Sequence, residues 1–115
     1  MTDQIVFFQR KDRVKESSQH VLSVTFRDRA TAANVTPTNI RYRIDDLNSG
    51  QAVLDWTSVS ADDEITITIT PTQNALRDQS RVCEVREVVV AADYGLATQY
   101  IDSVQYTLEN LRGVT

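Results

Sequence analysis

The sequence predicts an all-β protein, an antiparallel β-sandwich of about seven strands, and three observations lead to this prediction. Val, Ile and Thr make up 34 of the 115 residues, and β-branched side chains favour the half-buried surface of a sheet. Several segments alternate apolar and polar residues with a period of two, as strands with one buried face do. Turn residues separate these segments at spacings of roughly 8 to 15 residues, which is typical of a sandwich.

The first element is a short apolar run at residues 4–9, followed by a charged connection. Phe7 and Phe8 are adjacent, so on a strand they face opposite ways and one of them needs cover from outside the domain. We therefore expect an N-terminal strand or docking arm at residues 1–16, which contacts a neighbouring subunit. Residues 17–115 form the sandwich domain.

The next elements are a strand and a hairpin. Residues 20–26 alternate with Leu22, Val24 and Phe26 on one face, and a polar loop containing Pro37 follows. Residues 40–46 and 51–56 are extended runs on either side of a turn that ends at Gly50. This arrangement predicts a β-hairpin.

The second half of the chain contains three more strands. Residues 64–70 place three Ile on one face and three Thr on the other, whereas residues 71–78 have room for one helical turn at most. Residues 81–92 include the run 88–92, which is apolar on both faces, as in a central strand, and residues 98–108 form the last strand. The side chains expected in the core are Leu22, Val24, Phe26, Ile65, Ile67, Ile69, Val88, Val90, Tyr106 and Leu108.

Length and composition bound the class of protein. A chain of 115 residues with 41% hydrophobic and 24% charged residues suits one soluble globular domain. No run approaches the roughly 18 apolar residues of a transmembrane helix, and the first residues lack the pattern of a signal peptide. We therefore expect a soluble product made in the cytoplasm, with no membrane partner.

The charges favour a protein partner over a nucleic acid. The net charge is −4, so the general attraction of a basic protein to phosphates is missing. Residues 1–43 carry eight Lys/Arg and four Asp/Glu, whereas residues 44–115 carry four and twelve. Ten of the twelve basic residues are Arg, the residue suited to bidentate pairing at interfaces. The two halves are complementary, so further copies of the chain are expected partners.

Catalytic and metal chemistry have little support in the sequence. Cys83 is the only cysteine and His20 the only histidine, which excludes sites that need two of either. We expect His20 at a surface strand end and Cys83 as a small buried hydrophobe. Asp46, Asn48 and Gly50 have the spacing of the start of a calcium loop, but Thr57 stands where its glutamate would be, so a hairpin turn is preferred. No enzyme activity, cofactor, metal or small-molecule substrate is predicted.

Residues 40–111 resemble the small immunoglobulin-like virion proteins that tailed bacteriophages encode among their head and neck genes. The segments that carry the resemblance are residues 40–47, 49–50, 55–59, 65–71, 74–76 and 100–111. The same stretch is similar to immunoglobulin and fibronectin type III sandwiches in general. It departs from them where Val82 replaces the corner tyrosine and where a single cysteine excludes the inter-sheet disulfide.

The resemblance implies a non-enzymatic structural component of the virion, a head decoration or neck accessory protein. Its partners would be capsid, portal or tail subunits and further copies of itself. The residues expected at the subunit interface are Phe7, Phe8, Arg10, Arg13, Arg41 and Arg43.

Two alternatives remain open. The first is an adhesion or carbohydrate-binding module, and a small β-barrel hydrolase is a more remote one. A sugar platform would use exposed Trp56, Tyr42 or Tyr94 clustered near acidic groups, whereas a structural protein would present a flat, Arg-rich surface without a pocket. Trp56 itself is expected in the core or at its rim.

Overall fold

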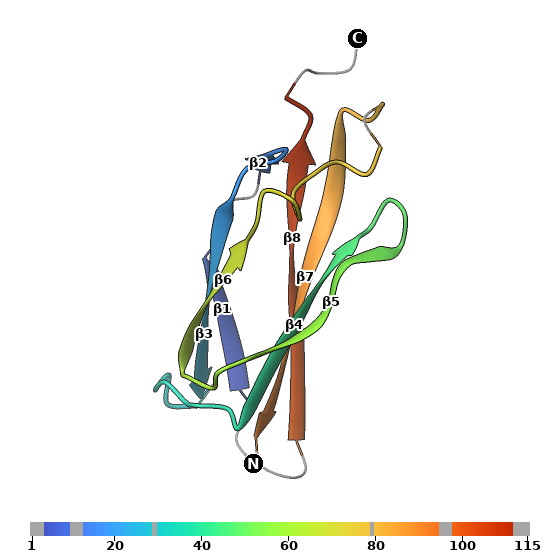
Figure 1. The fold of residues 1–115 in the computed structure, drawn as a ribbon. Coiled ribbons are helices and arrows are strands. Elements are labelled where there is room, and N and C mark those ends of the chain that lie inside the picture. The colour runs from blue at the N-terminus through green and yellow to red at the C-terminus, as the bar shows by residue number, and fades with distance from the viewer. Residues whose placement is uncertain (1–3, 10–12, 29, 79, 95–97, 112–115) are drawn as a thin grey trace.

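The computed structural model describes residues 4–9, 13–28, 30–78, 80–94 and 98–111, of which residues 4–9, 98 and 99 are described by their backbone alone. Within these residues the chain forms eight strands and no helix (Figure 1). The strands are β1 (Gln4–Gln9), β2 (Arg13–Lys15), β3 (His20–Asp28), β4 (Asn39–Asp46), β5 (Gln51–Val59), β6 (Glu64–Ile69), β7 (Cys83–Tyr94) and β8 (Thr98–Glu109). In the same residues no helix is long and apolar enough to cross a membrane.

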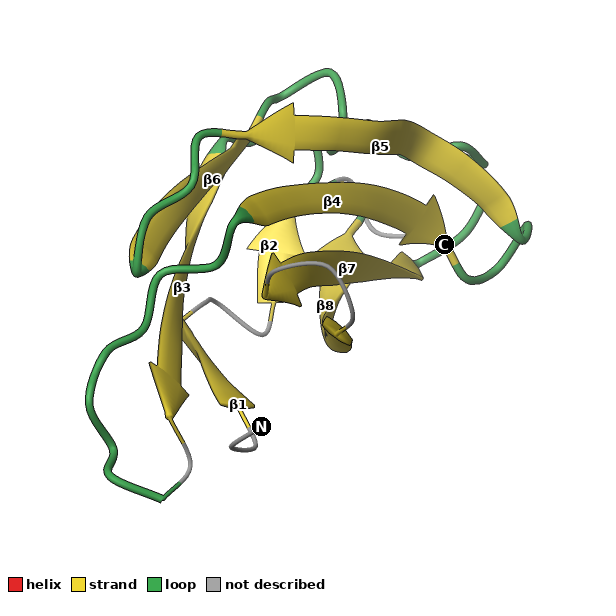
Figure 2. Ribbon diagram, turned by 90° about the horizontal axis from the view of Figure 1, so that it is seen from below, coloured by secondary structure: helices red, strands yellow, loops and turns green. Residues whose placement is uncertain are grey.

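The strands form two sheets that pack face to face (Figure 2). One sheet has the order β1-β3-β6 and the other β2-β8-β7-β4-β5. All neighbouring strands are antiparallel except β2 and β8, which run parallel over three residue pairs. The prediction of an all-β sandwich is confirmed.

The strand order is that of an immunoglobulin-like sandwich. Such domains place strands A, B and E in one sheet and C, F and G in the other, with an extra strand beside C in variable-type domains. Here β1-β3-β6 correspond to A, B and E, and β8-β7-β4-β5 to G, F, C and the extra strand. The predicted count of about seven becomes eight in the described residues, because the N-terminal segment contributes one strand to each sheet.

The N-terminal segment therefore belongs to the sandwich. β1 pairs with β3 over six residues. The charged connection expected after it contains β2, whose Val14 is buried between exposed Arg13 and Lys15. Val14 places one apolar side chain in the core, and the pairing of β2 with β8 holds the strand at the sheet edge. Docking of residues 1–16 on a neighbouring subunit stays a prediction.

The core lies between the two sheets and contains all ten side chains that the alternation placed there. The register explains this, because the Ile residues of β6 lie opposite alternate residues of β3 on the same inner face. The structure adds Val14, Ile40, Ile44, Leu76 and Ala92 to the core cluster.

The hairpin of β4 and β5 is confirmed, and its turn uses the oxygens that resembled calcium ligands. Asp46 Oδ2 accepts a hydrogen bond from Ser49 N at 3.1 Å, and Asn48 Oδ1 accepts one from Val85 N at 2.8 Å. Gly50 has a φ of 75°, which glycine adopts without strain. Among the described residues, no three His, Cys, Asp or Glu side chains are grouped as metal ligands are.

Residues 71–78, where one helical turn was possible, form turns around a buried polar residue, Asn74. Asn74 Nδ2 donates to Ser18 O at 2.7 Å and lies 2.9 Å from His20 Nδ1, while Tyr106 Oη donates to Asn74 Oδ1 at 2.8 Å. The Ser18 carbonyl requires a donor, which fixes the amide orientation and makes His20 Nδ1 an acceptor. We call these four residues the Asn74 network.

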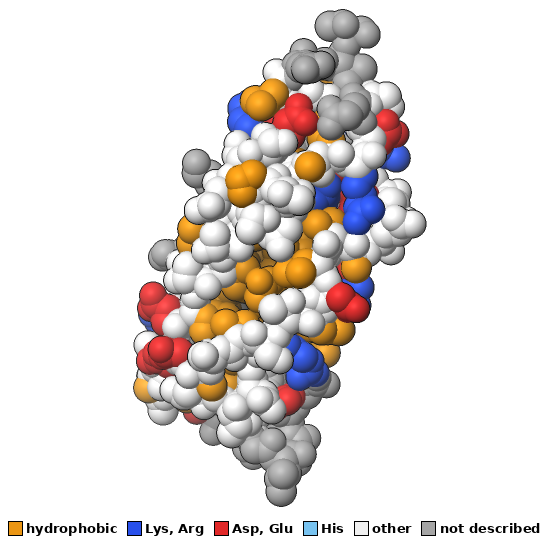
Figure 3. All heavy atoms as spheres, viewed as in Figure 1, with side chains coloured by type: hydrophobic (Ala, Val, Ile, Leu, Met, Phe, Trp, Pro, Cys, Tyr) orange, Lys and Arg blue, Asp and Glu red, His pale blue; other side chains and the backbone are white. Residues whose placement is uncertain are grey.

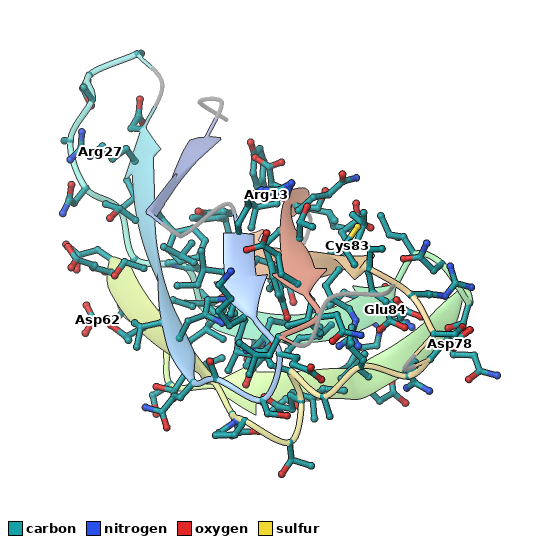
Figure 4. The ribbon with its side chains drawn as sticks, turned by 90° about the horizontal axis from the view of Figure 1, so that it is seen from above. Arg13, Arg27, Asp62, Asp78, Cys83 and Glu84 are labelled. Atoms are coloured by element: carbon teal, nitrogen blue, oxygen red, sulfur yellow. The ribbon has the colours of Figure 1, made fainter. Side chains whose placement is uncertain are left out.

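For two residues, the observed burial is the reverse of the predicted one. His20 is 7% exposed, not at the surface, because it shares the inner face of β3 with Leu22 and the Asn74 network satisfies its ring. Cys83 is exposed, not buried, because the inner positions at this end of β7 belong to Glu84 and Arg86. In Figure 4 Glu84 lies on the inner side of β7 and Cys83 on the other side.

A buried ionic cluster fastens the 71–78 segment to the core. Arg86 is fully buried and donates to Glu84 Oε1 at 2.8 Å and to the backbone carbonyls of Gln73 at 2.7 Å and Ala75 at 2.9 Å. Its Nε also lies 3.4 Å from Asp46 Oδ1. A buried guanidinium needs such partners to offset its lost hydration. This cluster therefore has a structural role.

Candidate interaction surface

The outer face of the five-stranded sheet carries the exposed tryptophan of the described chain, and an irregularity of the hairpin places it there. Tyr42 pairs with Thr57 and Ile44 with Leu54, so Asp55 and Trp56 together lie opposite Arg43. This is a β-bulge, a feature that turns side chains away from the regular alternation. Figure 2 shows β5 as the outermost strand of this sheet. Trp56 is 41% exposed, so it is not in the core.

Two arginines of β4 lie over the Trp56 ring. Ile40 and Ile44 point into the core, so Arg41 and Arg43 occupy the outer face between them. Their guanidinium carbons are 5.4 and 5.6 Å from the ring centroid, within the range of cation–π attraction. The indole is thereby held in one orientation while a large part of it stays accessible.

Each arginine also has an acidic partner. Arg41 Nη1 lies 3.3 Å from Asp93 Oδ2, and Arg43 Nη2 lies 2.7 Å from Asp45 Oδ1, which also accepts from Arg43 Nε at 3.0 Å. The hydrogen bond with Asp45 raises the pKa of Arg43. Positive and negative groups therefore alternate across this face.

The register extends the surface across β7 and β8. Arg41 pairs with Ala91, which pairs with Ile101, and Ile101 is 56% exposed. An exposed isoleucine thus ends the row of outward positions that runs from Ser58 of β5 through Arg41, and Ser58 is two residues from Trp56 on the same strand. We define the Trp56 surface by its residues Trp56, Arg41, Arg43, Asp45, Asp93 and Ile101.

The structure brings together only part of the predicted interface. Arg41 and Arg43 meet at Trp56, whereas Arg13 is on β2, three strands from β4 in the same sheet. Phe7 and Phe8 are on β1 in the other sheet, paired with Thr25 and Val24 of β3. Their side chains, and Arg10, lie outside the described side chains.

The expected charge pairing between copies competes with pairing inside the chain. Arg13 and Lys15 lie 3.9 and 3.3 Å from Glu109, and Arg41 pairs with Asp93. These three bridges join the basic first part of the sequence to the acidic second part within one molecule. The charge asymmetry is therefore satisfied in part by the fold itself.

The aromatics of the sugar-binding alternative do not gather at one place. Tyr42 and Tyr94 are partly buried against the core, while Trp56 is on the outer face. Burial raises the pKa of Tyr94 to about 12. Trp56 has arginines as its ring neighbours, so a flat aromatic platform beside acidic groups is not formed by these three residues.

An open hollow of about 270 Å³ lies elsewhere, between β5 and the 71–78 segment. Its lining includes Val53, Ala75, Leu76 and Arg77. The Trp56 surface contributes no residue to this lining. The expectation of a surface without a pocket is therefore wrong for the part of the molecule around the hollow.

Sequence reasoning named Arg41 and Arg43 but missed their setting. Asp45 and Asp93 were not recognised as partners, because Asp93 is about fifty positions away along the chain and meets Arg41 only through the β4–β7 pairing. The adjacent pair Asp55-Trp56 was the available signal for the bulge, since regular alternation would not expose both.

No protein-family model matches the chain, and no curated protein matches it. Among solved structures it is similar to the cohesin module of a family 33 glycoside hydrolase from Clostridium perfringens. The TM-score is 0.44 and the identity 11%, over 96% of this chain and 99% of that chain. At this level the likeness carries no information on function.

Proposed function

We propose that the chain is a non-catalytic binding module that attaches to a partner protein through the Trp56 surface. The observation that carries the proposal is the half-exposed indole held between Arg41 and Arg43, each of which is itself paired with an aspartate. Trp and Arg are the residues most enriched among those that dominate binding energy at protein interfaces.

The surface is suited to association because its anchor is already ordered. Ordering a side chain on binding costs roughly 0.5 to 1.5 kcal/mol, and the contacts with Arg41 and Arg43 reduce that cost for Trp56. Covering a large apolar side chain contributes about 1.5 to 3 kcal/mol. The exposed Ile101 at the other end of the row adds apolar area.

The charges of the surface suit a protein better than a nucleic acid. Arg41 and Arg43 are neutralised by Asp93 and Asp45, so few positive groups are left to displace counterions from phosphates. Alternating charges fix the orientation and choice of a protein partner more than its affinity.

The resemblance of residues 40–111 to small virion proteins supports a virion subunit of a tailed phage as the partner. A capsid, portal or tail subunit presents its surface in many symmetric copies, and a small sandwich that binds each copy decorates or completes the particle. In this proposal the chain is made in the host cytoplasm and ends in the virion.

Purified particles test the proposal. Density-gradient-purified virions from cells that produce this chain should contain it in a fixed ratio to the major capsid or tail protein, as measured by quantitative mass spectrometry. Absence of the chain from the particles would contradict the virion assignment. Binding of soluble oligosaccharides that Trp56→Ala abolishes would instead favour the carbohydrate-binding alternative.

A further inference from the structure

We propose that two copies of the chain associate by antiparallel pairing of their β6 strands, which joins the two three-stranded sheets into one six-stranded sheet. This contact is on the opposite sheet from the Trp56 surface and does not depend on the function proposed for that surface. Four observations lead to it: the free edge, the lack of protection at that edge, the open apolar side next to it and the self-complementarity of the strand.

β6 is an edge strand whose outward backbone groups can be assigned. It ends the order β1-β3-β6. Phe26 N donates to Asp63 O at 2.8 Å just before the strand, and the register continues as Val24 with Ile65 and Leu22 with Ile67. In an antiparallel ladder alternate residues bond to the neighbour. The backbone groups of Thr66 and Thr68 therefore point away from β3, towards the free edge.

The other three edges carry features that hinder pairing. β2 has only three residues, of which Arg13 and Lys15 are charged. The register of β5 with β4 shifts twice, and β1 lies against β8 of the other sheet. β6 has a regular register, no bulge and no proline, and its one charged residue is Glu64 at its start. Natural edge strands are usually protected by such devices, so their absence at β6 indicates a surface that is covered.

The side of the sandwich next to β6 is open. Figure 3 shows hydrophobic side chains gathered in the opening between β6 and β5. On β5, Val53, Leu54 and Val59 are only partly buried against the core. The hollow lined by Val53, Ala75 and Leu76 lies on this same side. A strand added at β6 would stand beside this opening and cover part of it.

A second copy of β6 fits this edge because the strand is complementary to itself. With Ile67 on the two-fold axis, Thr66 lies opposite Thr68 of the other copy, and each such pair exchanges two backbone hydrogen bonds. Glu64 then lies opposite Thr70, so no two carboxylates meet. The apolar openings of both copies face the same axis, and a two-fold contact of this kind closes on itself without forming filaments.

Sedimentation velocity of the full chain over an about hundred-fold range of concentration tests the proposal. We expect a reversible dimer. The double variant Thr66→Lys, Thr68→Lys places the introduced ammonium groups opposite each other and should raise the dimer Kd at least about tenfold. The matched control is Ser23→Lys, Thr25→Lys, on the outer face of the central strand β3, which should dimerise like the wild type.

Amide hydrogen exchange of the wild type provides a second readout if the double variant does not fold. Exchange at Thr66 and Thr68 should slow as the concentration rises, while exposed amides of the 30–38 loop should not change. A monomeric wild type, a dimer that tolerates Thr66→Lys, Thr68→Lys, or Thr66 and Thr68 amides that exchange rapidly at all concentrations would each overturn the proposal.

Discussion

At the scale of single residues, the buried polar groups decide how the turn segment is fastened to the core. The amide of Asn74 is a hydrogen-bond partner of Ser18 O, His20 Nδ1 and Tyr106 Oη. The His20 and Tyr106 rings also pack edge to face, 4.7 Å apart. Residues 17–20 and 71–78 are thereby tied to β8 by one side chain.

Asn74→Ala tests this arrangement. The substitution removes one hydrogen-bond partner each from Ser18 O, His20 Nδ1 and Tyr106 Oη, and a buried polar group that loses its partner costs about 1 to 3 kcal/mol. We expect the free energy of unfolding in urea to fall by at least about 2 kcal/mol. Thr72→Ala, an exposed change in the same turn, is the control and should have little effect. Equal effects of the two substitutions would contradict the assigned network.

Because Tyr106 is buried, we expect the protein to lose stability in alkaline solution. Burial raises the pKa of Tyr106 from 10.0 to about 12, although the nearby Arg86 works in the opposite direction. Between these values the folded state keeps a proton that the unfolded state has released, so stability falls as the pH rises from about 10 to about 12. The loss is about 2 to 3 kcal/mol.

The control for this pH dependence is Tyr106→Phe, measured by chemical denaturation at several pH values. The variant starts from a lower stability because the bond to Asn74 is lost, but it should lose less on going to high pH. Tyr94, whose pKa is also raised to about 12, is intact in both proteins and its contribution cancels. If the free energy of unfolding fell equally with pH for the wild type and Tyr106→Phe, the burial of the Tyr106 hydroxyl would be contradicted.

Sequence patterns predicted the apolar residues better than the polar ones. Leu22 and Ile67 could be placed in the core from alternation alone, because exposure of their whole face would be costly. His20 and Cys83 were misplaced, since their burial depends on Asn74 and Glu84, whose contacts are formed only by the fold. The outward position of Trp56 follows from a bulge, which alternation cannot reveal.

At the scale of strands, the alternation of β6 gives it a buried face that contributes to stability and an exposed face that contributes little to it. Its Ile side chains are in the core and its Thr side chains are exposed. Ile67→Ala should lower the free energy of unfolding by roughly 2 to 5 kcal/mol, because it leaves a cavity in a small core. Thr66→Ala should cost much less. Thermal denaturation measures both, and a comparable loss for the two would show that the inner and outer faces were assigned wrongly.

The N-terminal strand provides a test at the same scale. β1 pairs with β3 along its whole length, so deletion of residues 1–9 should expose the edge of β3 and lower the Tm by several degrees or more. Circular dichroism during heating measures this. A truncated chain as stable as the full one would show that the pairing contributes little, and would favour the separate docking arm.

The strand count and the division of the N-terminal segment could be predicted only in part. The apolar run at residues 4–9 indicated a strand. The sequence could not show whether this strand pairs within the domain or with a neighbouring subunit, because the pairing depends on an edge of β3 that only the fold makes available. The three residues of β2 are too few to show an alternating pattern. The burial of Val14 identifies β2 as a strand of the sandwich only when the opposite sheet is known.

At the scale of the whole molecule, the two sheets present different outer faces. The five-stranded sheet carries the Trp56 surface, with alternating charges around an aromatic anchor. The outer face of the three-stranded sheet presents mainly Ser and Thr side chains from β3 and β6. This sheet ends at the unprotected β6 edge. Under our two proposals, the first face binds a different protein and the β6 edge binds a second copy, and the two contacts together would make the chain a multivalent structural component.

In the folded chain, several basic residues of the first part of the sequence pair with acidic residues of the second part in the same molecule. Arg13, Lys15 and Arg41 pair with Glu109 and Asp93 of the same molecule. Exposed pairs of this kind contribute about 0 to 1 kcal/mol each. Association between copies is therefore expected to depend on apolar and backbone contacts more than on these charges.

The central claim, attachment through the Trp56 surface, is tested most directly by incorporation of Trp56→Ala into particles. Purified virions assembled with Trp56→Ala, with wild type, or with Leu47→Ala, a similarly exposed change at the tip of the same hairpin, are compared by quantitative mass spectrometry. Loss of about 2 kcal/mol of contact corresponds to a roughly thirtyfold weaker affinity. We expect Trp56→Ala to be depleted while Leu47→Ala and wild type are retained, and equal incorporation of all three folded proteins would contradict the account.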